Sequence, residues 1–240
     1  MHKQLLLRYL DMLNKLYIAN WKMYLSHTQA SAWLQAHGAE IAALAKENTI
    51  VICPDFTLLP NMHGLLYGAQ NCAAEQAGAY TGEISAQTLK ELGCSYCIVG
   101  HSERRTLFGE TTQECAKKIT LLQENGIIPI YCIGEQEQSS NPYAVLKSQL
   151  DPVLQEAPQH LIVAYEPVWA IGTGKTPPTA FLTEVVTWIK EYIPVNFPVI
   201  YGGSVTEVTI RELKSITIID GFLIGKASTD FQQLKKIVLS

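Results

Sequence analysis

Short runs of almost continuous apolar residues recur eight times along the chain, separated by longer segments with helical patterns. The runs are residues 16–21, 49–53, 69–72, 96–99, 127–133, 161–165, 199–201 and 221–224. Continuous apolar runs of this length are typical of parallel β-strands that are buried on both faces. The pattern therefore predicts eight buried strands that alternate with helices.

Boundary residues support several of the helical segments. Asn141 and Pro142 place a capping side chain before a proline at the first helical position. Residues 228–230, Ser-Thr-Asp, supply capping groups for the last helix. Gly93 and Gly126 follow two helical segments, at the position where a C-terminal cap is expected.

Eight strand–helix alternations without an interrupting linker indicate a parallel α/β fold. We predict a single (β/α)8 barrel over residues 16–240, because eight regular repeats in a chain of this length suit a barrel better than a doubly wound open sheet. In such barrels the active site lies at the C-terminal ends of the strands. Residues 1–15 are interpreted as an N-terminal extension: the spacing of their leucines suits a short packing helix, and a translation start at Met12 is the alternative.

Composition narrows the possible classes of protein. The 240 residues are 48% hydrophobic and 17% charged, with a net charge of −4, which favours a soluble globular protein and gives no indication of a nucleic-acid partner. No apolar run approaches the ~20 residues of a membrane-spanning helix. The six cysteines lie mostly in apolar runs, as expected of buried thiols in a reducing, cytoplasmic environment. Cys94 and Cys97 have the spacing of metal ligands but lack a partner set, so we expect no metal site.

Residues that could take part in catalysis or binding follow five of the predicted strands. They are Asn20 and Lys22 after the first, His101 and Glu103 after the fourth, Glu166 after the sixth, Gly202, Gly203 and Ser204 after the seventh, and Gly225 and Lys226 after the eighth. On one rim of a barrel they would bring together a cation, an imidazole, a carboxylate and glycine-rich turns. Glycine lets the backbone approach an anion closely, so the rim is predicted to bind one.

The segment 164–175, Ala-Tyr-Glu-Pro-Val-Trp-Ala-Ile-Gly-Thr-Gly-Lys, is the most informative part of the chain. A predicted strand delivers Glu166 to its C-terminal end, and Pro167 and Trp169 stiffen the chain before a glycine-flanked stretch at 171–174. A carboxylate beside a lid suits a general base. Taken alone, Glu166 would be a surface acid on an ordinary strand-to-helix loop, so the interpretation depends on the other motifs.

Several motifs, in order, resemble the triosephosphate isomerase family from Tyr17 to about Ser228. They are Asn20-Trp21-Lys22-Met23, the segments 98–105 (Ile-Val-Gly-His-Ser-Glu-Arg-Arg) and 164–175, and the segments 201–205 (Tyr-Gly-Gly-Ser-Val) and 220–225 (Asp-Gly-Phe-Leu-Ile-Gly). The resemblance implies an aldose–ketose isomerase that interconverts dihydroxyacetone phosphate and glyceraldehyde 3-phosphate through an enediolate. It implies no metal and no organic cofactor.

The resemblance also implies five catalytic roles. Glu166 would be the base that takes the proton, and His101 the neutral imidazole that polarises the carbonyl. Lys22 would supply the positive charge that faces the enediolate oxygen, and Glu103 would pair with this lysine. Asn20 would donate to the substrate oxygen, so that Asn20 and Lys22 also belong to the substrate-binding set.

Backbone N–H groups of Gly172, Ser204, Gly225 and Lys226 would bind the phosphate by the same resemblance. The chain departs from the family pattern at two positions. Lys226 stands where the family usually has glycine, and it would carry ~1–2 kcal/mol of strain if this position required a positive φ. Tyr24 stands where the family usually has asparagine, which bears on the loop geometry and on subunit contacts.

Other functions fit the residues less well. A P-loop nucleotide hydrolase is disfavoured because Trp169 occupies the position of its first glycine, and a dinucleotide site because Pro177 occupies that of its third. Two alternatives stay open: another phosphate-sugar enzyme on the same barrel, and a catalytically inactive phosphate-binding barrel. The resemblance implies a homodimer, with a tetramer as the alternative, in which the loop from Gly78 to Ser85 docks on the neighbouring subunit near Lys22.

Overall fold

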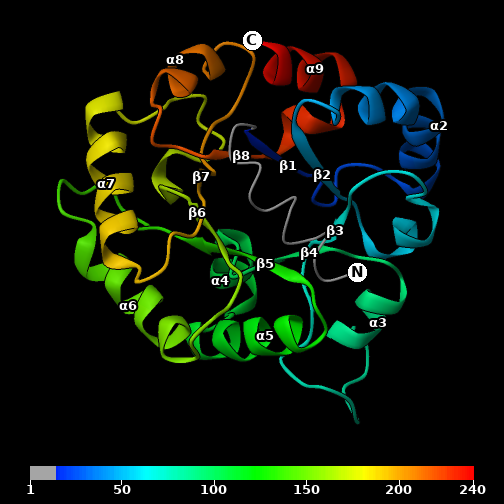
Figure 1. The fold of residues 1–240 in the computed structure, drawn as a ribbon, viewed down its shortest axis with the longest axis horizontal. Coiled ribbons are helices and arrows are strands. Elements are labelled where there is room, and N and C mark those ends of the chain that lie inside the picture. The colour runs from blue at the N-terminus through cyan, green and yellow to red at the C-terminus, as the bar shows by residue number, and fades with distance from the viewer. Residues whose placement is uncertain (1–14) are drawn as a thin grey trace.

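Eight parallel strands form the centre of the molecule in the computed structural model, which describes residues 15–240. They are β1 Leu16–Asn20, β2 Thr49–Cys53, β3 Gly68–Ala69, β4 Tyr96–Val99, β5 Ile128–Ile133, β6 Ile162–Tyr165, β7 Val199–Tyr201 and β8 Gly221–Ile224. The strands are hydrogen-bonded in the order β2-β1-β8-β7-β6-β5-β4-β3, and a parallel bridge between Ile52 and Tyr67 brings β2 next to the start of β3. The strands thus form a nearly closed ring, with the helices outside it (Figure 1). The predicted (β/α)8 barrel is confirmed.

Helices and short 3₁₀ segments connect the strands. They are α2 His27–Leu44, η1 Phe56–Asn61, α3 Ala86–Glu91, α4 Ser102–Phe108, α5 Thr112–Glu124, α6 Tyr143–Gln155, η2 Val168–Ala170, α7 Thr179–Tyr192, α8 Ile210–Ser215, η3 Lys226–Thr229 and α9 Phe231–Leu239. Most of the predicted N-terminal extension, including Met12, lies outside the described residues. No helix of residues 15–240 combines the length and the apolar character needed to cross a membrane.

The core consists of two layers that follow from the alternation of side chains along each strand. One cluster contains only strand residues and fills the inside of the barrel: Ile18, Val51, Cys53, Ile98, Ile128, Ile130, Cys132, Ile162, Ala164, Ile200 and Leu223. The flanking residues Tyr17 and Ala19 belong instead to the larger cluster between strands and helices. Both faces of each strand are therefore buried, which explains why the apolar runs in the sequence are continuous.

Several predicted boundaries were wrong. Three strands are one residue shorter than predicted, because β1 ends at Asn20, β5 begins at Ile128 and β6 begins at Ile162. The third strand is β3, Gly68–Ala69, and not residues 69–72, because the chain leaves the sheet at Gln70, whose side chain bonds to the carbonyls of Lys22 and Cys53. Helix α6 begins one residue later than predicted. Pro142 occupies the N-cap position, and the Asn141 N–H is taken by the Ser139 hydroxyl.

Other boundary predictions are confirmed. Asp230 caps α9 by accepting a hydrogen bond of 3.0 Å from the Gln233 N–H. Gly93 and Gly126 follow α3 and α5 with φ of 89° and 65°, the left-handed conformation that glycine adopts without strain.

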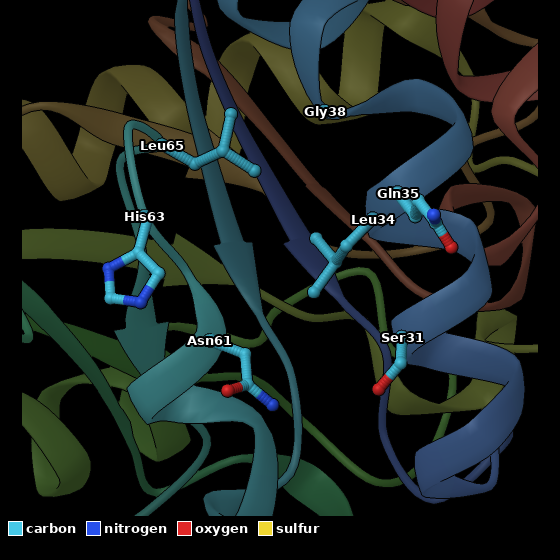
Figure 2. A pocket seen from close by; sticks show the side chains of 7 residues that line it. All are labelled: Ser31, Leu34, Gln35, Gly38, Asn61, His63 and Leu65. Atoms are coloured by element: carbon cyan, nitrogen blue, oxygen red, sulfur yellow. The ribbon is translucent and has the colours of Figure 1, made fainter.

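The crossover between β2 and β3 is the shortest, because it spans only residues 54–67 and its helical part is the 3₁₀ segment η1. A cavity of about 270 Å³ lies between α2 and this segment, lined by Ser31, Leu34, Gln35, Gly38, Asn61, His63 and Leu65. Figure 2 shows Leu34 of α2 and Leu65 on the facing segment directed toward the space between them. The cavity contains none of the predicted site residues.

Candidate active site

A buried carboxylate and an imidazole face each other above the interior of the barrel. Glu166 directly follows β6, and only 2% of this residue is exposed. Its Oε2 accepts a hydrogen bond of 3.0 Å from the Ser102 N–H at the start of α4. Its Oε1 lies 3.3 Å from His101 Nε2 but has no hydrogen-bond partner. One carboxylate oxygen is thus fixed, and the other is buried without a donor.

The imidazole of His101 is oriented by the helix that it caps. His101 is the N-cap residue of α4, and its Nδ1 accepts a hydrogen bond of 3.2 Å from the Glu103 N–H. A ring nitrogen that accepts a hydrogen bond carries no proton, so the proton of the neutral ring is on Nε2. Nε2, the ring position left to carry a proton, lies 3.3 Å from Glu166 Oε1 without forming a hydrogen bond to it.

A lysine lies on the same rim, in an unusual backbone conformation. Lys22 follows β1, and its Nζ lies 2.6 Å from Glu103 Oε1. Its φ is +48°, in the left-handed region that a long side chain rarely adopts. The buried Asn20 accepts a hydrogen bond of 3.1 Å from the Lys22 N–H through Oδ1. The ends of β1 and β4 thus place a cation close to the imidazole.

Glycines leave the space that Glu166 occupies. A Cβ added at Gly202, after β7, would lie 2.8 Å from Glu166 Cγ. A Cβ added at Gly134, after β5, would lie 1.7 Å from the Glu166 carbonyl oxygen. A Cβ atom less than 3 Å from another heavy atom forces that atom to move. Glycine directly after β5 and β7 therefore leaves the space in which Glu166 is buried.

Hydrogen bonds attach the segment after Glu166 to the barrel, among them one from the Val168 N–H to the Glu135 carbonyl at 3.0 Å. The Ser204 hydroxyl, after β7, donates 2.7 Å to the Ala170 carbonyl. The Trp169 indole donates 2.7 Å to Glu135 Oε1, and the Tyr165 hydroxyl bonds to the same carboxylate. Burial raises the pKa of Glu135, and these donors oppose the increase.

Beyond these attachments, residues 172–175 are exposed. Gly172 and Gly174 have φ of 71° and 73°, which a residue with a side chain would adopt only with strain. This exposed, glycine-hinged stretch next to a buried carboxylate is the predicted lid segment.

A buried ion-pair network supports the loop after β4. Glu110 Oε1 lies 3.0 Å from Lys118 Nζ, and Glu110 Oε2 lies 2.7 Å from Arg104 Nε. The Gly100 N–H, next to His101, donates 3.3 Å to the same carboxylate. Burial acts to raise the pKa of Glu110, but the two cations outweigh it and lower the pKa overall.

Comparison with known proteins decides the family. The family model described as triosephosphate isomerase matches residues 15–240. The triosephosphate isomerase of Cupriavidus necator is 42% identical over 237 residues, covering 90% of this chain and 95% of that protein. That of Magnetococcus marinus is 39% identical over 232 residues, covering 87% and 91%.

This chain belongs to the triosephosphate isomerase family. The crystal structure of the Bartonella henselae triosephosphate isomerase superimposes with a TM-score of 0.82 at 31% identity, and the match covers 93% of this chain and 97% of that one. Fold and family membership thus agree over the whole barrel.

The departure from the family pattern at Lys226 leaves the backbone relaxed. Lys226 is the first residue of η3 and is exposed. The non-glycine residues with positive φ in the described chain are Lys22 and Ala157, so the strain considered for Lys226 does not arise. Gly225, which precedes it, would place a Cβ 3.4 Å from Lys22 Cε.

Sequence reasoning missed Glu135 and Gln70. Glu135 stands two residues after β5, in the same kind of strand-end position as the predicted site residues, so its place in the pattern gave a usable signal. Gln70 stands directly after β3, and its contacts with Lys22 and Cys53 join residues 48 and 17 positions away. Among residues 15–240, no group of three or more His, Cys, Asp or Glu side chains is arranged to hold a metal ion.

Proposed function

We propose that this chain interconverts dihydroxyacetone phosphate and D-glyceraldehyde 3-phosphate by proton transfer through an enediolate, as a step of glycolysis and gluconeogenesis. The observation that carries the proposal is the pair of groups 3.3 Å apart, Glu166 Oε1 and His101 Nε2, beside the ammonium group of Lys22. Isomerisation needs a base for a carbon-bound proton and an electrophile for the neighbouring oxygen, and these groups provide both.

Glu166 acts as the base. Oε1 has no hydrogen-bond donor and is free to take the substrate proton, while the bond from Ser102 to Oε2 orients the carboxylate. The proton moves from one substrate carbon to Oε1 and is then returned to the neighbouring carbon. Atoms and charge therefore balance with no external oxidant or reductant.

His101 acts as the electrophile in its neutral form. Nε2–H donates to the substrate carbonyl oxygen, and this hydrogen bond strengthens as negative charge develops on the oxygen. The Glu103 N–H on Nδ1 keeps the ring neutral and fixes its orientation.

Lys22 supplies positive charge to the substrate and to the developing enediolate, and Asn20 assists it through its side-chain amide. In the unliganded chain Glu103 pairs with Lys22 at 2.6 Å. Because 44% of the Glu103 side chain is exposed, this pair is partly screened, and a bound phosphate ester competes with it effectively.

The backbone N–H groups of Gly172, Ser204, Gly225 and Lys226 bind the phosphate. The attachment of Ala170 to Ser204 supports this set, because it holds the lid segment beside the turn after β7. The same set makes phosphate binding independent of a metal.

The protein works as a cytoplasmic homodimer. The segments that follow β1, β3 and β4 carry large exposed apolar side chains: Met23, Tyr24, Tyr80, Leu107 and Phe108. Apolar exposure of this kind is typical of an interface, and the loop from Gly78 to Ser85 lies among these segments. All six cysteines are free and buried, which suits a reducing compartment. Sedimentation velocity is expected to give twice the mass of one chain, and a monomer at micromolar concentration would contradict the dimer.

A coupled assay with glyceraldehyde 3-phosphate tests the activity. Run in D₂O, the reaction is expected to place deuterium on the substrate carbon that receives the proton, because the proton held on Oε1 exchanges with solvent between the two transfers. Binding of 2-phosphoglycolate without turnover would indicate the inactive phosphate-binding barrel. Turnover of other sugar phosphates alone would indicate another enzyme on the same barrel.

A further inference from the structure

The backbone of Lys22 is held in its left-handed conformation by two side chains. Its N–H donates 3.1 Å to Asn20 Oδ1, and its carbonyl accepts 2.9 Å from Gln70 Nε2. A φ of +48° is unfavourable for a residue with a side chain. It persists where the surroundings fix the peptide groups on both sides of the Cα, and these two bonds do so.

Gln70 connects Lys22 to the neighbouring strand ends. The same Nε2 donates 3.0 Å to the carbonyl of Cys53, the last residue of β2, and that carbonyl also accepts the Trp21 N–H at 3.1 Å. One amide group, placed directly after β3, therefore uses its two hydrogens to tie the loop after β1 to the end of β2. A shorter side chain or one without two donors cannot make both bonds.

We propose that Gln70 is a positioning residue for Lys22: its amide holds the Lys22 carbonyl, and thereby keeps the ammonium group at the rim. The proposal rests on the proposed function, in which that ammonium faces the substrate. When the carbonyl is released, the Lys22 backbone relaxes toward negative φ, and the direction of its side chain changes with it. Misplacement of a reacting group on the order of 1 Å costs up to ~10²-fold in rate.

A double-mutant cycle separates positioning from a general structural role. The variants are Gln70→Met, Lys22→Met and the double variant, and kcat and KM are measured for each. Gln70→Met keeps the length and removes both donors. If Gln70 acts through Lys22, Gln70→Met lowers kcat/KM about 10-fold when Lys22 is present. Added to the Lys22→Met variant, the same change leaves kcat/KM unchanged within about twofold.

A matched control tests whether any lost glutamine has this effect. Gln123 also holds loop backbone with its side-chain amide, accepting the N–H groups of Gln159 and His160 before β6, at the opposite end of the strands. Gln123→Met is expected to lower the melting temperature and to leave kcat/KM unchanged within about twofold.

An equal fall for Gln70→Met in both backgrounds, or no fall in either, would overturn the positioning role. If Gln70→Met does not fold, Gln70→Glu has the same shape without the two donors, and the same outcomes apply. The cycle is repeated on the dissociation constant of 2-phosphoglycolate, which needs no turnover. If the unaltered chain binds this ligand but has no isomerase activity, the proposed function fails, and the binding cycle still decides the role of Gln70. If it does not bind the ligand, both fail.

Discussion

At the scale of single residues, the site is defined by which polar atoms have a hydrogen-bond partner and which do not. Ser102 occupies one oxygen of Glu166 and leaves the other without a donor, and the Glu103 N–H occupies one nitrogen of His101 and leaves the other protonated. In the proposed function these assignments make the two side chains a base and a neutral electrophile. Both depend on the backbone at the start of α4, so the proposed catalytic pair and the helix cap are one arrangement.

Shortening the base tests this arrangement. Glu166→Asp withdraws the carboxylate by one methylene group, and a shift on the order of 1 Å is expected to lower kcat by about 10²-fold while KM changes much less. Steady-state kinetics of the purified variant measure this. Glu207→Asp, an exposed acid paired with Lys236, is the control and is expected to behave as the unaltered chain. Normal turnover of Glu166→Asp would remove Glu166 from the role of base.

The conformation of Lys22 predicts a difference in stability between two inactive variants. Lys22→Gly and Lys22→Ala both lose the ammonium group, so both are expected to lose most of their turnover. Glycine tolerates a φ of +48°, whereas alanine is strained there, so the glycine variant is expected to be more stable by about 1 kcal/mol. Urea denaturation measures the difference. Equal stability of the two variants would show that this backbone position is unstrained.

At the scale of elements, the sequence predicted what depends on continuous local pattern. The strands were recognised because both faces are buried, as Tyr17 and Ile18 illustrate by packing on opposite sides of β1. The candidate site residues were singled out because they follow strand ends, and their catalytic roles stay a prediction. The end of β3 was missed because the role of Gln70 depends on two carbonyls distant in sequence. The start of α6 was missed by one residue because Pro142 itself occupies the N-cap position, where no side chain caps the helix.

The exposure of the lid segment predicts how it responds to a protease. Lys175 is exposed at the end of the glycine-hinged stretch, so trypsin is expected to cleave after it in the unliganded protein. Binding of 2-phosphoglycolate draws the Gly172 N–H onto the phosphate and is expected to slow this cleavage. Ser204→Ala removes the hydroxyl that holds Ala170 and keeps the backbone N–H, so it is expected to speed cleavage without ligand. Equal cleavage with and without the ligand would show that the segment does not close.

At the scale of the whole molecule, a chain with a net charge of −4 has to concentrate positive potential where it binds an anion. Lys22, Lys175 and Lys226 lie on segments of the functional rim. Arg104 and Lys118 are instead committed to Glu110, beneath the loop that carries His101. Glu110 therefore links the stability of the fold to the geometry of the site. Its charge, and with it this stability, depends on pH.

The sign of its pH dependence follows from its lowered pKa. A carboxyl whose pKa is lower in the folded than in the unfolded chain stabilises the fold above its unfolded value of 4.5, and this contribution is lost as pH falls through the folded pKa. Glu110→Gln leaves Lys118, whose side chain is only 6% exposed, without an opposite charge, because its other partner, Asn71, is neutral. The variant is therefore expected to be less stable by about 3 kcal/mol at pH ~7.

Urea denaturation of both proteins from neutral pH down to pH values below that unfolded pKa tests this. The difference between them is expected to stay constant above the unfolded pKa and to shrink below it, as Glu110 of the unaltered chain gains a proton and loses its attraction to both cations. Glu207→Gln, at an exposed pair, is the control and is expected to change stability by less than about 1 kcal/mol at any pH. A loss for Glu110→Gln that is the same at every pH would mean that Glu110 acts through packing and hydrogen bonds and not through its charge.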